Sequence, residues 1–202
     1  KSDEFFNGFP DLGVYQAIAC GPAIGQSSST AEALQNLILN ARVPLVLDAD
    51  ALNILSGHVD WMEQLPSGTV ITPHPKEFDR LTGASPDMYT RHLKQLEFAR
   101  RYKVIVVLKG AHTIIAAPDG NSYINTTGNP GMATGGAGDV LTGIVVSLIA
   151  QGYSPLNASL VGVFIHGLAA DIALETSSME ALIAGDIIEK LGQAFRIVKG
   201  HG

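Results

Sequence analysis

Short apolar runs alternate with amphipathic stretches through the first half of the chain, and longer apolar segments dominate the second half. Short apolar runs rich in valine and isoleucine predict buried strands, whereas apolar residues spaced three and four apart predict helices. The predicted strands cover residues 14–20, 43–48, 69–72 and 104–108. The predicted helices cover residues 30–40 after a Ser/Thr cluster, a short stretch after Asp48, a stretch ending near Leu81, and residues 86–102.

Helical connections between consecutive strands predict parallel pairing. A parallel sheet has to be covered on both faces, so we expect an α/β fold with a doubly wound, mainly parallel sheet and helices on both faces. Two shorter strands, at residues 113–117 and 122–125, flank a turn at residues 118–121 and predict a hairpin. From Gly136 onward the pattern is helical, with breaks at residues 154–155 and 184–186. No repeat or linker divides the sequence, so residues 1–202 are interpreted as one domain.

The first predicted strand follows only a short lead-in, residues 1–12. Nothing in that lead-in has the length or pattern to cover the second face of a sheet or to close over a substrate. We therefore expect an N-terminally incomplete domain, completed by a further segment or by a neighbouring subunit.

Composition narrows the possible partners. Only 16% of residues are charged and the net charge is -6, so neither nucleic acid nor an acidic membrane surface is an expected partner. The longest apolar region, residues 158–174, is interrupted by glycine, histidine and aspartate, which argues against a membrane span. The single cysteine, Cys20, lies in an apolar strand and fits a reducing compartment, so we expect a cytoplasmic protein.

A glycine-rich stretch leads into an apolar helix that starts near Gly136. The first amides of such a helix lack intrahelical partners and lie at the positive end of its dipole, so they favour an anion such as phosphate. Asp139 falls in this first turn. Its carboxylate either complements the dipole or takes the proton from a hydroxyl that attacks a bound phosphoryl group.

Polar residues also follow the predicted strands, where ligands of open α/β sheets bind. Asp48, Asp50 and Asn53 follow the second strand, although Asp50 is also placed to cap the helix after it. His74 and Glu77 follow the third strand, and the fourth strand runs into residues 109–113, Lys-Gly-Ala-His-Thr.

Four segments taken together, residues 47–53, 71–77, 109–113 and 128–139, closely resemble motifs of the ADP/ATP-dependent NAD(P)H-hydrate dehydratase family of the ribokinase-like superfamily. The resemblance extends from about residue 14 to the end of the chain. It implies that a nucleotide phosphorylates the hydroxyl of hydrated NADH or NADPH, that phosphate then leaves, and that the dihydronicotinamide is restored.

The resemblance also implies a role for each matching residue. Asp139 is the expected base, and the amides of Gly136, Ala137 and Gly138 are expected to stabilise the transferring phosphoryl group. The expected nucleotide-binding residues are Lys109, Gly110, Ala111, His112, Thr113 and Gly138. The expected substrate-binding residues are Gly21, Gly25, Asp50, Asn53, His74 and Asp139. Glu77 is expected to order Mg²⁺ through water.

Three positions depart from the family pattern. Ala23 and Lys76 stand where glycine is common, and Ala137 stands where threonine is common. All three departures keep the backbone amide. His166 and Asp171 also fit the family pattern, but they lie on an apolar helix, so we expect packing and helix-contact roles for both.

Two alternative functions share these features. A small-molecule kinase of the same superfamily, acting on a vitamin-precursor alcohol, would use the same anion site and base, and an inactive nucleotide-binding subunit would keep the anion site alone. A dehydrogenase is not favoured, because the first glycine turn lacks the G-x-G-x-x-G spacing.

The expected phosphoryl donor is ADP in preference to ATP, with Mg²⁺. The resemblance further implies a homotetramer, and fusion to or association with a hydrate epimerase.

Overall fold

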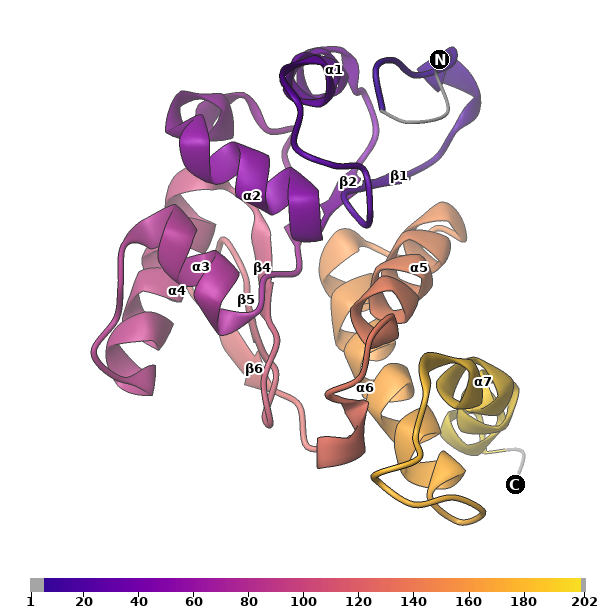
Figure 1. Ribbon diagram of the computed structural model, residues 1–202. Helices are drawn as coiled ribbons and strands as arrows, with labels where there is room; N and C mark the ends of the chain where they lie inside the picture. Colours follow the sequence, from indigo (N-terminus) through magenta and orange to yellow (C-terminus); the bar gives the residue numbers. More distant parts are fainter. Residues whose placement is uncertain (1–5, 201–202) are drawn as a thin grey trace.

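The structure, a computed structural model, describes residues 6–200 as one mixed sheet with helices on both faces (Figure 1). The strands are β1 Ile18–Cys20, β2 Leu45–Leu47, β3 Val70–Ile71, β4 Ile105–Leu108, β5 Ile114–Ala116 and β6 Ser122–Ile124. The α-helices are α1 Ser28–Asn40, α2 Ala49–Gly57, α3 Pro75–Thr82, α4 Met88–Tyr102, α5 Ala137–Ala150, α6 Pro155–Ala173 and α7 Ala184–Val198. Three 3-10 helices are also present, η1 Leu12–Val14, η2 Val59–Gln64 and η3 Pro130–Met132.

The sheet has the strand order β1-β2-β3-β4-β5-β6, so spatial neighbours are also neighbours in sequence. Strands β1 to β4 are parallel, and β5 and β6 form the predicted antiparallel hairpin. The expected α/β fold with a mainly parallel sheet is confirmed. The predicted start of the first strand at Val14 is wrong, because Val14 belongs to η1 and is 67% exposed.

Alternate strand residues separate the two covering layers. Leu45 and Leu47 pack with α1 to α4, whereas Val46, between them, packs with α5 and α6. In Figure 1 the helices α1 to α4 lie on one side of the strands and α5 and α6 on the other. The strand order does not reverse among the described residues. Each layer therefore consists of helices that are consecutive in sequence: α1 to α4 precede the hairpin, and α5 and α6 follow it.

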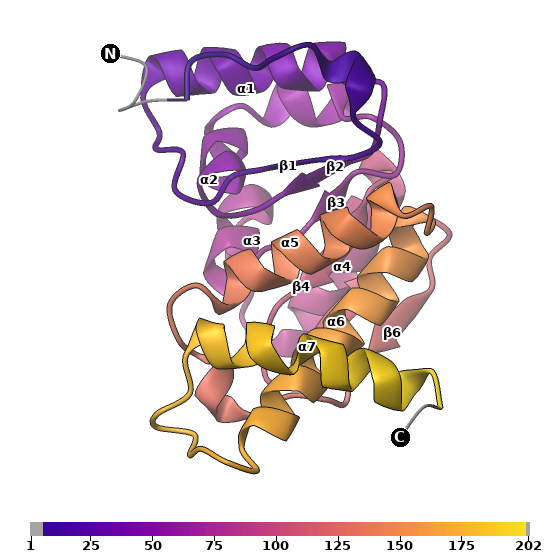
Figure 2. The same cartoon turned by 90° about the vertical axis from the view of Figure 1, so that its right-hand side faces the viewer.

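Helix α7 forms a third layer, outside α5 and α6 (Figure 2). It packs on α6 through a separate apolar cluster that includes Ile165, Leu182 and Ile187. Helix α6 is long and apolar enough to cross a membrane by length and composition, but 61% of that stretch is buried, and α5 and α7 both pack against it. The predicted break at residues 184–186 is misplaced, because these residues begin α7 and the break precedes them.

Gln95 of α4 is a fully buried polar side chain in the first layer. Its Nε2 donates to the carbonyl of Val106 in β4 at 2.9 Å and to the carbonyl of Ile114 in β5 at 2.8 Å. One amide therefore satisfies two strand carbonyls and ties α4 to the start of the hairpin.

We predict that Gln95→Leu lowers the free energy of unfolding by about 2–4 kcal/mol, because two buried carbonyls lose their donor. Urea unfolding is the measurement. The matched control is Gln64→Leu, an exposed position in η2, for which a change within about 0.5 kcal/mol is expected. Equal unfolding free energies for the two variants would contradict the clamping role of Gln95.

Candidate active site

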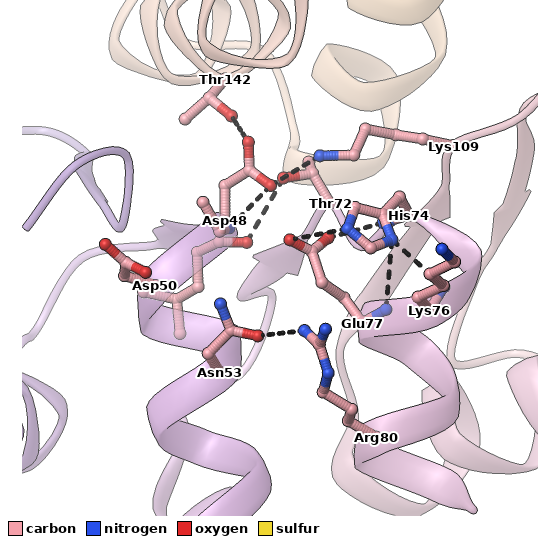
Figure 3. Close-up of polar contacts among 12 residues, drawn as sticks. Asp48, Asp50, Asn53, Thr72, His74, Lys76, Glu77, Arg80, Lys109 and Thr142 are labelled. Carbon is pink, nitrogen blue, oxygen red and sulfur yellow. Dashed lines mark hydrogen bonds and ion pairs between the residues drawn. The ribbon is translucent and has the colours of Figure 1, made fainter. Parts of the chain in front are cut away.

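Polar side chains from three parallel strands meet at the carboxyl edge of the sheet (Figure 3). Asp48 follows β2, His74 follows β3 and Lys109 follows β4. Because neighbouring parallel strands end at the same edge, residues far apart in sequence become neighbours there. The sequence-based expectation of a site at this edge agrees with the geometry.

The Asp48 carboxylate is the centre of this cluster. It is 1% exposed, and its Oδ1 accepts from Nζ of Lys109 at 2.7 Å and from the amide of Ala49 at 2.9 Å. Its Oδ2 accepts from Oγ1 of Thr142, on α5, at 2.9 Å. A buried carboxylate needs such partners, and here they come from three different elements. The sequence placed Asp48 at the cleft but gave no sign of this central position.

The N-terminus of α5 differs from those of the preceding α-helices. Side chains of Ser27, Asp48, His74 and Asp87 cap α1, α2, α3 and α4, whereas α5 begins at Gly136 with no side-chain cap. Gly136 adopts the left-handed region, with φ of 85°. Within residues 6–200, no acceptor is bonded to the amides of Gly138 and Asp139. The predicted helix start near Gly136 is confirmed, and the amides of Gly138 and Asp139 are available to an anion. The amide of Ala137, also expected at the anion, donates instead to the carbonyl of Thr134 at 3.4 Å.

Lys109 brings a cation to the same place. A Cβ on Gly138 would lie 3.4 Å from Nζ of Lys109 and 3.7 Å from Oδ2 of Asp48. The ammonium group therefore lies against the backbone of the first turn of α5, held there by Asp48. A cation and unpaired amides around one point form a cradle for phosphate oxygens. We call Lys109, Gly138 and the first amides of α5 the anion cradle.

Asp139 follows the cradle directly. Its side chain is exposed and makes no hydrogen bond or ion pair with any described residue. It is not among the residues that line the adjacent cavity, although Ala137 and Gly138 are. The carboxylate is therefore accessible at the end of α5, unlike Asp48, which is fully engaged.

The cavity beside the cradle has a volume of about 800 Å³, within the range of small-molecule sites. On one side it is bounded by the end of β4 and by the chain around the β5–β6 hairpin, and on the other by α5 and α6. All of the predicted nucleotide-binding residues line it, namely Lys109, Gly110, Ala111, His112, Thr113 and Gly138. His74, expected at the substrate, lines the same cavity.

His74 and Glu77 form a capping box at the start of α3. Nδ1 of His74 accepts from the amides of Lys76 and Glu77, at 3.1 and 3.2 Å, so the ring proton lies on Nε2. Nε2 is 3.4 Å from Oε1 of Glu77, whose Oε2 accepts from the amide of His74 at 2.7 Å. Glu77 is 6% exposed, so its carboxylate first of all fixes His74 at the cavity wall.

The expected Mg²⁺ would need oxygen ligands from the residues at this edge. The described residues contain no group of three or more His, Cys, Asp or Glu side chains arranged to hold a metal. Mg²⁺ commonly keeps several waters and binds one or two carboxylates together with substrate phosphates. The described residues at this edge do not form an all-protein cage, so the second mode is the one that they fit.

Of the remaining predicted substrate residues, Gly25 and Asp50 contact each other. Asp50 accepts from the amide of Gly25 at 2.9 Å through Oδ2, and its Oδ1 accepts from Gln26. Asn53 accepts from Arg80 at 2.6 Å. The suggestion that Asp50 caps α2 is wrong, because Asp48 is the N-cap. Asp50 holds the glycine turn after β1 instead.

Gly21 in that turn approaches Asp48 so closely that a Cβ would lie 1.8 Å from the Asp48 carbonyl oxygen. Only glycine fits there, and the turn after β1 is thereby held against the end of β2. Ala23 has φ of 54°, a left-handed conformation that suits the glycine common in the family at this position.

The expected packing role of Asp171 needs correction. Asp171 accepts from the amide of Gly128 at 2.8 Å and from Nδ2 of Asn129 at 3.0 Å, so it anchors the glycine-rich loop to α6. His166 lines the cavity. Burial lowers the pKa of His166 to about 4, which keeps its imidazole neutral at pH 7. The sequence around His166 is apolar, and a single histidine there did not predict a position at the cavity.

Cys20 agrees with its predicted role as a buried strand residue. Burial raises the pKa of its thiol to about 11. The thiol is thus protonated at neutral pH and plays no part in the site.

Comparisons with known proteins connect this geometry to a family. The sequence model of NAD(P)H-hydrate dehydratase matches residues 2–193. A bifunctional NAD(P)H-hydrate repair enzyme of Moorella thermoacetica is 39% identical over 187 residues, which is 92% of this chain and 35% of that protein. The ADP-dependent (S)-NAD(P)H-hydrate dehydratase of Bacillus subtilis is 33% identical over 186 residues, 90% of this chain and 64% of that protein.

Solved structures agree. The ADP/ATP-dependent NAD(P)H-hydrate dehydratase of Bacillus subtilis, co-crystallised with ATP and Mg²⁺, superposes with a TM-score of 0.79 at 32% identity, covering 97% of this chain and 68% of that one. A ribokinase-like superfamily protein of Enterococcus faecalis superposes with a TM-score of 0.76 at 26% identity, covering 90% and 63%. The chain thus spans about a third of the length of the bifunctional relative and 64% of the Bacillus subtilis one. With its ribokinase-like fold and a family match over residues 2–193, the chain belongs to the NAD(P)H-hydrate dehydratase family.

Proposed function

We propose that the protein is a nucleotide-dependent dehydratase of the S epimer of hydrated NADH or NADPH. A phosphoryl group passes from the nucleotide to the ring hydroxyl, and phosphate then leaves to restore the dihydronicotinamide. The observation that carries the proposal is the anion cradle: Lys109, fixed by Asp48, lies against the uncapped first turn of α5, next to the accessible carboxylate of Asp139.

Each residue has a defined task in this reaction. Asp139 accepts the hydroxyl proton as the oxygen attacks phosphorus. The amides at the start of α5 and the Lys109 ammonium hold the phosphoryl oxygens, whose negative charge they balance. His74, its tautomer set by two backbone amides, presents its ring at the wall of the same cavity. The C–O bond then breaks with its electron pair on phosphate, and loss of a proton from the neighbouring ring carbon restores the double bond.

Mg²⁺ would supply further neutralisation of phosphate charge. We assign to Glu77 the role of holding it through water. A small-molecule kinase would use the same cradle and base, so the two functions differ in whether phosphate stays on the product. The match of residues 71–77 and 109–113 to the family favours the dehydratase.

Assembly is a further part of the proposal. Exposed apolar side chains remain on the outer helix layer, notably Ile183, Ile188 and Ile197. Their position supports a homo-oligomer, with a homotetramer as the expected form. The bifunctional relatives support association with, or fusion to, a hydrate epimerase. We propose a cytoplasmic location, supported by the buried, protonated Cys20.

We predict that Asp139→Asn lowers turnover by about 10²–10⁴-fold, because the amide keeps the shape but cannot accept the hydroxyl proton. ADP affinity should stay nearly unchanged. Steady-state kinetics and calorimetric titration measure the two effects. Asp87→Asn, at the exposed N-cap of α4, is the control and should keep full activity. Full activity in Asp139→Asn would rule out the proposed base.

Two glycine-to-alanine substitutions in α5 distinguish an effect on the anion cradle from a general effect on helix stability. In Gly138→Ala the new methyl group would lie in contact with Nζ of Lys109 and Oδ2 of Asp48, in the space that phosphate oxygens are expected to occupy, so ADP binding should weaken by about tenfold or more. Gly143, on the same helix, has open space around its Cβ position. Gly143→Ala should bind ADP normally and gain about 0.5–1 kcal/mol of stability. Equal ADP affinity for both variants, measured by calorimetry, would show that the cradle does not hold the nucleotide.

The donor prediction is that ADP supports faster turnover than ATP at equal concentration with Mg²⁺. The Bacillus subtilis relative named as ADP-dependent supports this choice. Initial rates with the two nucleotides measure the preference, and faster turnover with ATP would refute it.

A further inference from the structure

The chain that links the hairpin to α5 first crosses to α6 (Figure 1) and forms part of the cavity wall. We call residues 127–132 of this link the strap. All of them except Gly131 line the cavity. The strap contains no regular element beyond the three-residue helix η3. Its position, and with it the shape of this wall, therefore depends on its contacts with α6.

Asp171 of α6 holds the strap through both oxygens of its carboxylate. Oδ2 accepts from the amide of Gly128 at 2.8 Å, and Oδ1 accepts from Nδ2 of Asn129 at 3.0 Å. Oδ1 of Asn129 accepts in turn from the amide of Gly131 at 3.1 Å. Among residues 6–200 the side chain of Asn129 has no other hydrogen-bond partner. The contacts thus run from α6 through Asn129 to the start of η3.

The strap also packs tightly on α6 at its first residue. A Cβ on Gly167 would lie 2.7 Å from the carbonyl oxygen of Thr127, so only glycine fits there. Oγ1 of Thr127 donates to the carbonyl of Phe164 at 2.9 Å. These contacts fix where the strap meets α6, but they do not reach Asn129 or η3. That part of the wall depends on Asp171.

We propose that Asp171 is a positioning residue of the nucleotide site, which acts through the strap and does not touch the ligand. Asp171 is not among the described residues that line the cavity, whereas Gly128 and Asn129, which it holds, are. A released strap would leave a binding-competent wall in only a fraction of the molecules, and the apparent affinity would fall by that fraction. The inference rests on the proposed function, because it takes ADP as the ligand of the cavity.

The polarity of the contacts provides a sharp test. Carboxylate oxygens only accept, so Asp171 satisfies a donor at each oxygen. In Asp171→Asn the new amide can accept at one of the two places, and at the other a donor faces a donor. Asn129→Asp alone brings two carboxylates together. The double variant Asp171→Asn/Asn129→Asp again gives every donor an acceptor, with the polarity of one contact reversed.

Calorimetric titration of the full chain with ADP measures the effect on binding. We expect each single variant to bind ADP about tenfold or more weakly, and the double variant to recover most of the loss. Asp87→Asn is the matched control, because the Asp87 carboxylate likewise accepts from a backbone amide, that of Thr90. It should bind ADP like the wild type. A double variant that binds ADP no better than the single variants would overturn the inference.

Hydrogen exchange without nucleotide measures the strap itself. In each single variant the amides of residues 127–132 should exchange about tenfold faster than in the wild type, and in the double variant the rates should return toward those of the wild type. Faster exchange with unchanged ADP affinity would show that the nucleotide does not depend on the strap. Weaker ADP binding with unchanged exchange would show that Asp171 does not act through it. Either result would overturn the inference.

Turnover separates positioning from a general loss of structure. Helix α5 carries Asp139 and is tied to the sheet edge by the contact of Thr142 with Asp48, which does not involve the strap. In Asp171→Asn the KM for ADP should therefore rise about tenfold while kcat stays within about threefold of the wild type. A fall in kcat as large as that of Asp139→Asn, with ADP affinity unchanged, would contradict a role at the nucleotide.

The wild-type titration tells the two levels of the argument apart. If the wild type does not bind ADP, the proposed function fails, and the assignment of Asp171 fails with it. If the wild type binds ADP and Asp171→Asn binds it equally well, only the assignment of Asp171 fails.

Discussion

The Asp48 carboxylate is the interaction on which the rest of the site depends. It is buried, and its partners come from β4 and α5 as well as from its own helix. A buried charge left without its partner is strongly destabilising, so the native structure must keep Lys109 and Thr142 in place. The buried Asp48 carboxylate needs a positive partner, and the contact with Lys109 thus fixes the ammonium group at the first turn of α5, the helix that carries Asp139.

The arrangement of layers explains why that helix end is open. Helices α1 to α4 pack on one face of the sheet and begin with side-chain caps. Helix α5 crosses the other face over β1 and β2 and begins at a left-handed glycine without a cap. Helix α6 then holds the preceding loop through Asp171, and α7 covers α6 from outside. The unpaired amides therefore lie on a rigid support.

Local sequence signals predicted the parts of this architecture that depend on local physics. The apolar strand runs, the start of α5 at Gly136, the hairpin and the burial of Cys20 all follow from periodicity or turn chemistry. The contacts around Asp48 could not be predicted in this way, because Lys109 and Thr142 are 61 and 94 residues away in sequence. The same limit applies to His166, whose location on the cavity wall depends on how α6 packs.

The central claim is that this site moves a phosphoryl group onto a hydroxyl and then eliminates it. Its most direct test is product analysis after incubation of the purified protein with NADH hydrate, ADP and Mg²⁺. The account predicts that NADH absorbance, inorganic phosphate and AMP appear in equal amounts. A stable phosphorylated product without recovery of NADH absorbance would contradict it and would identify a kinase of the same fold.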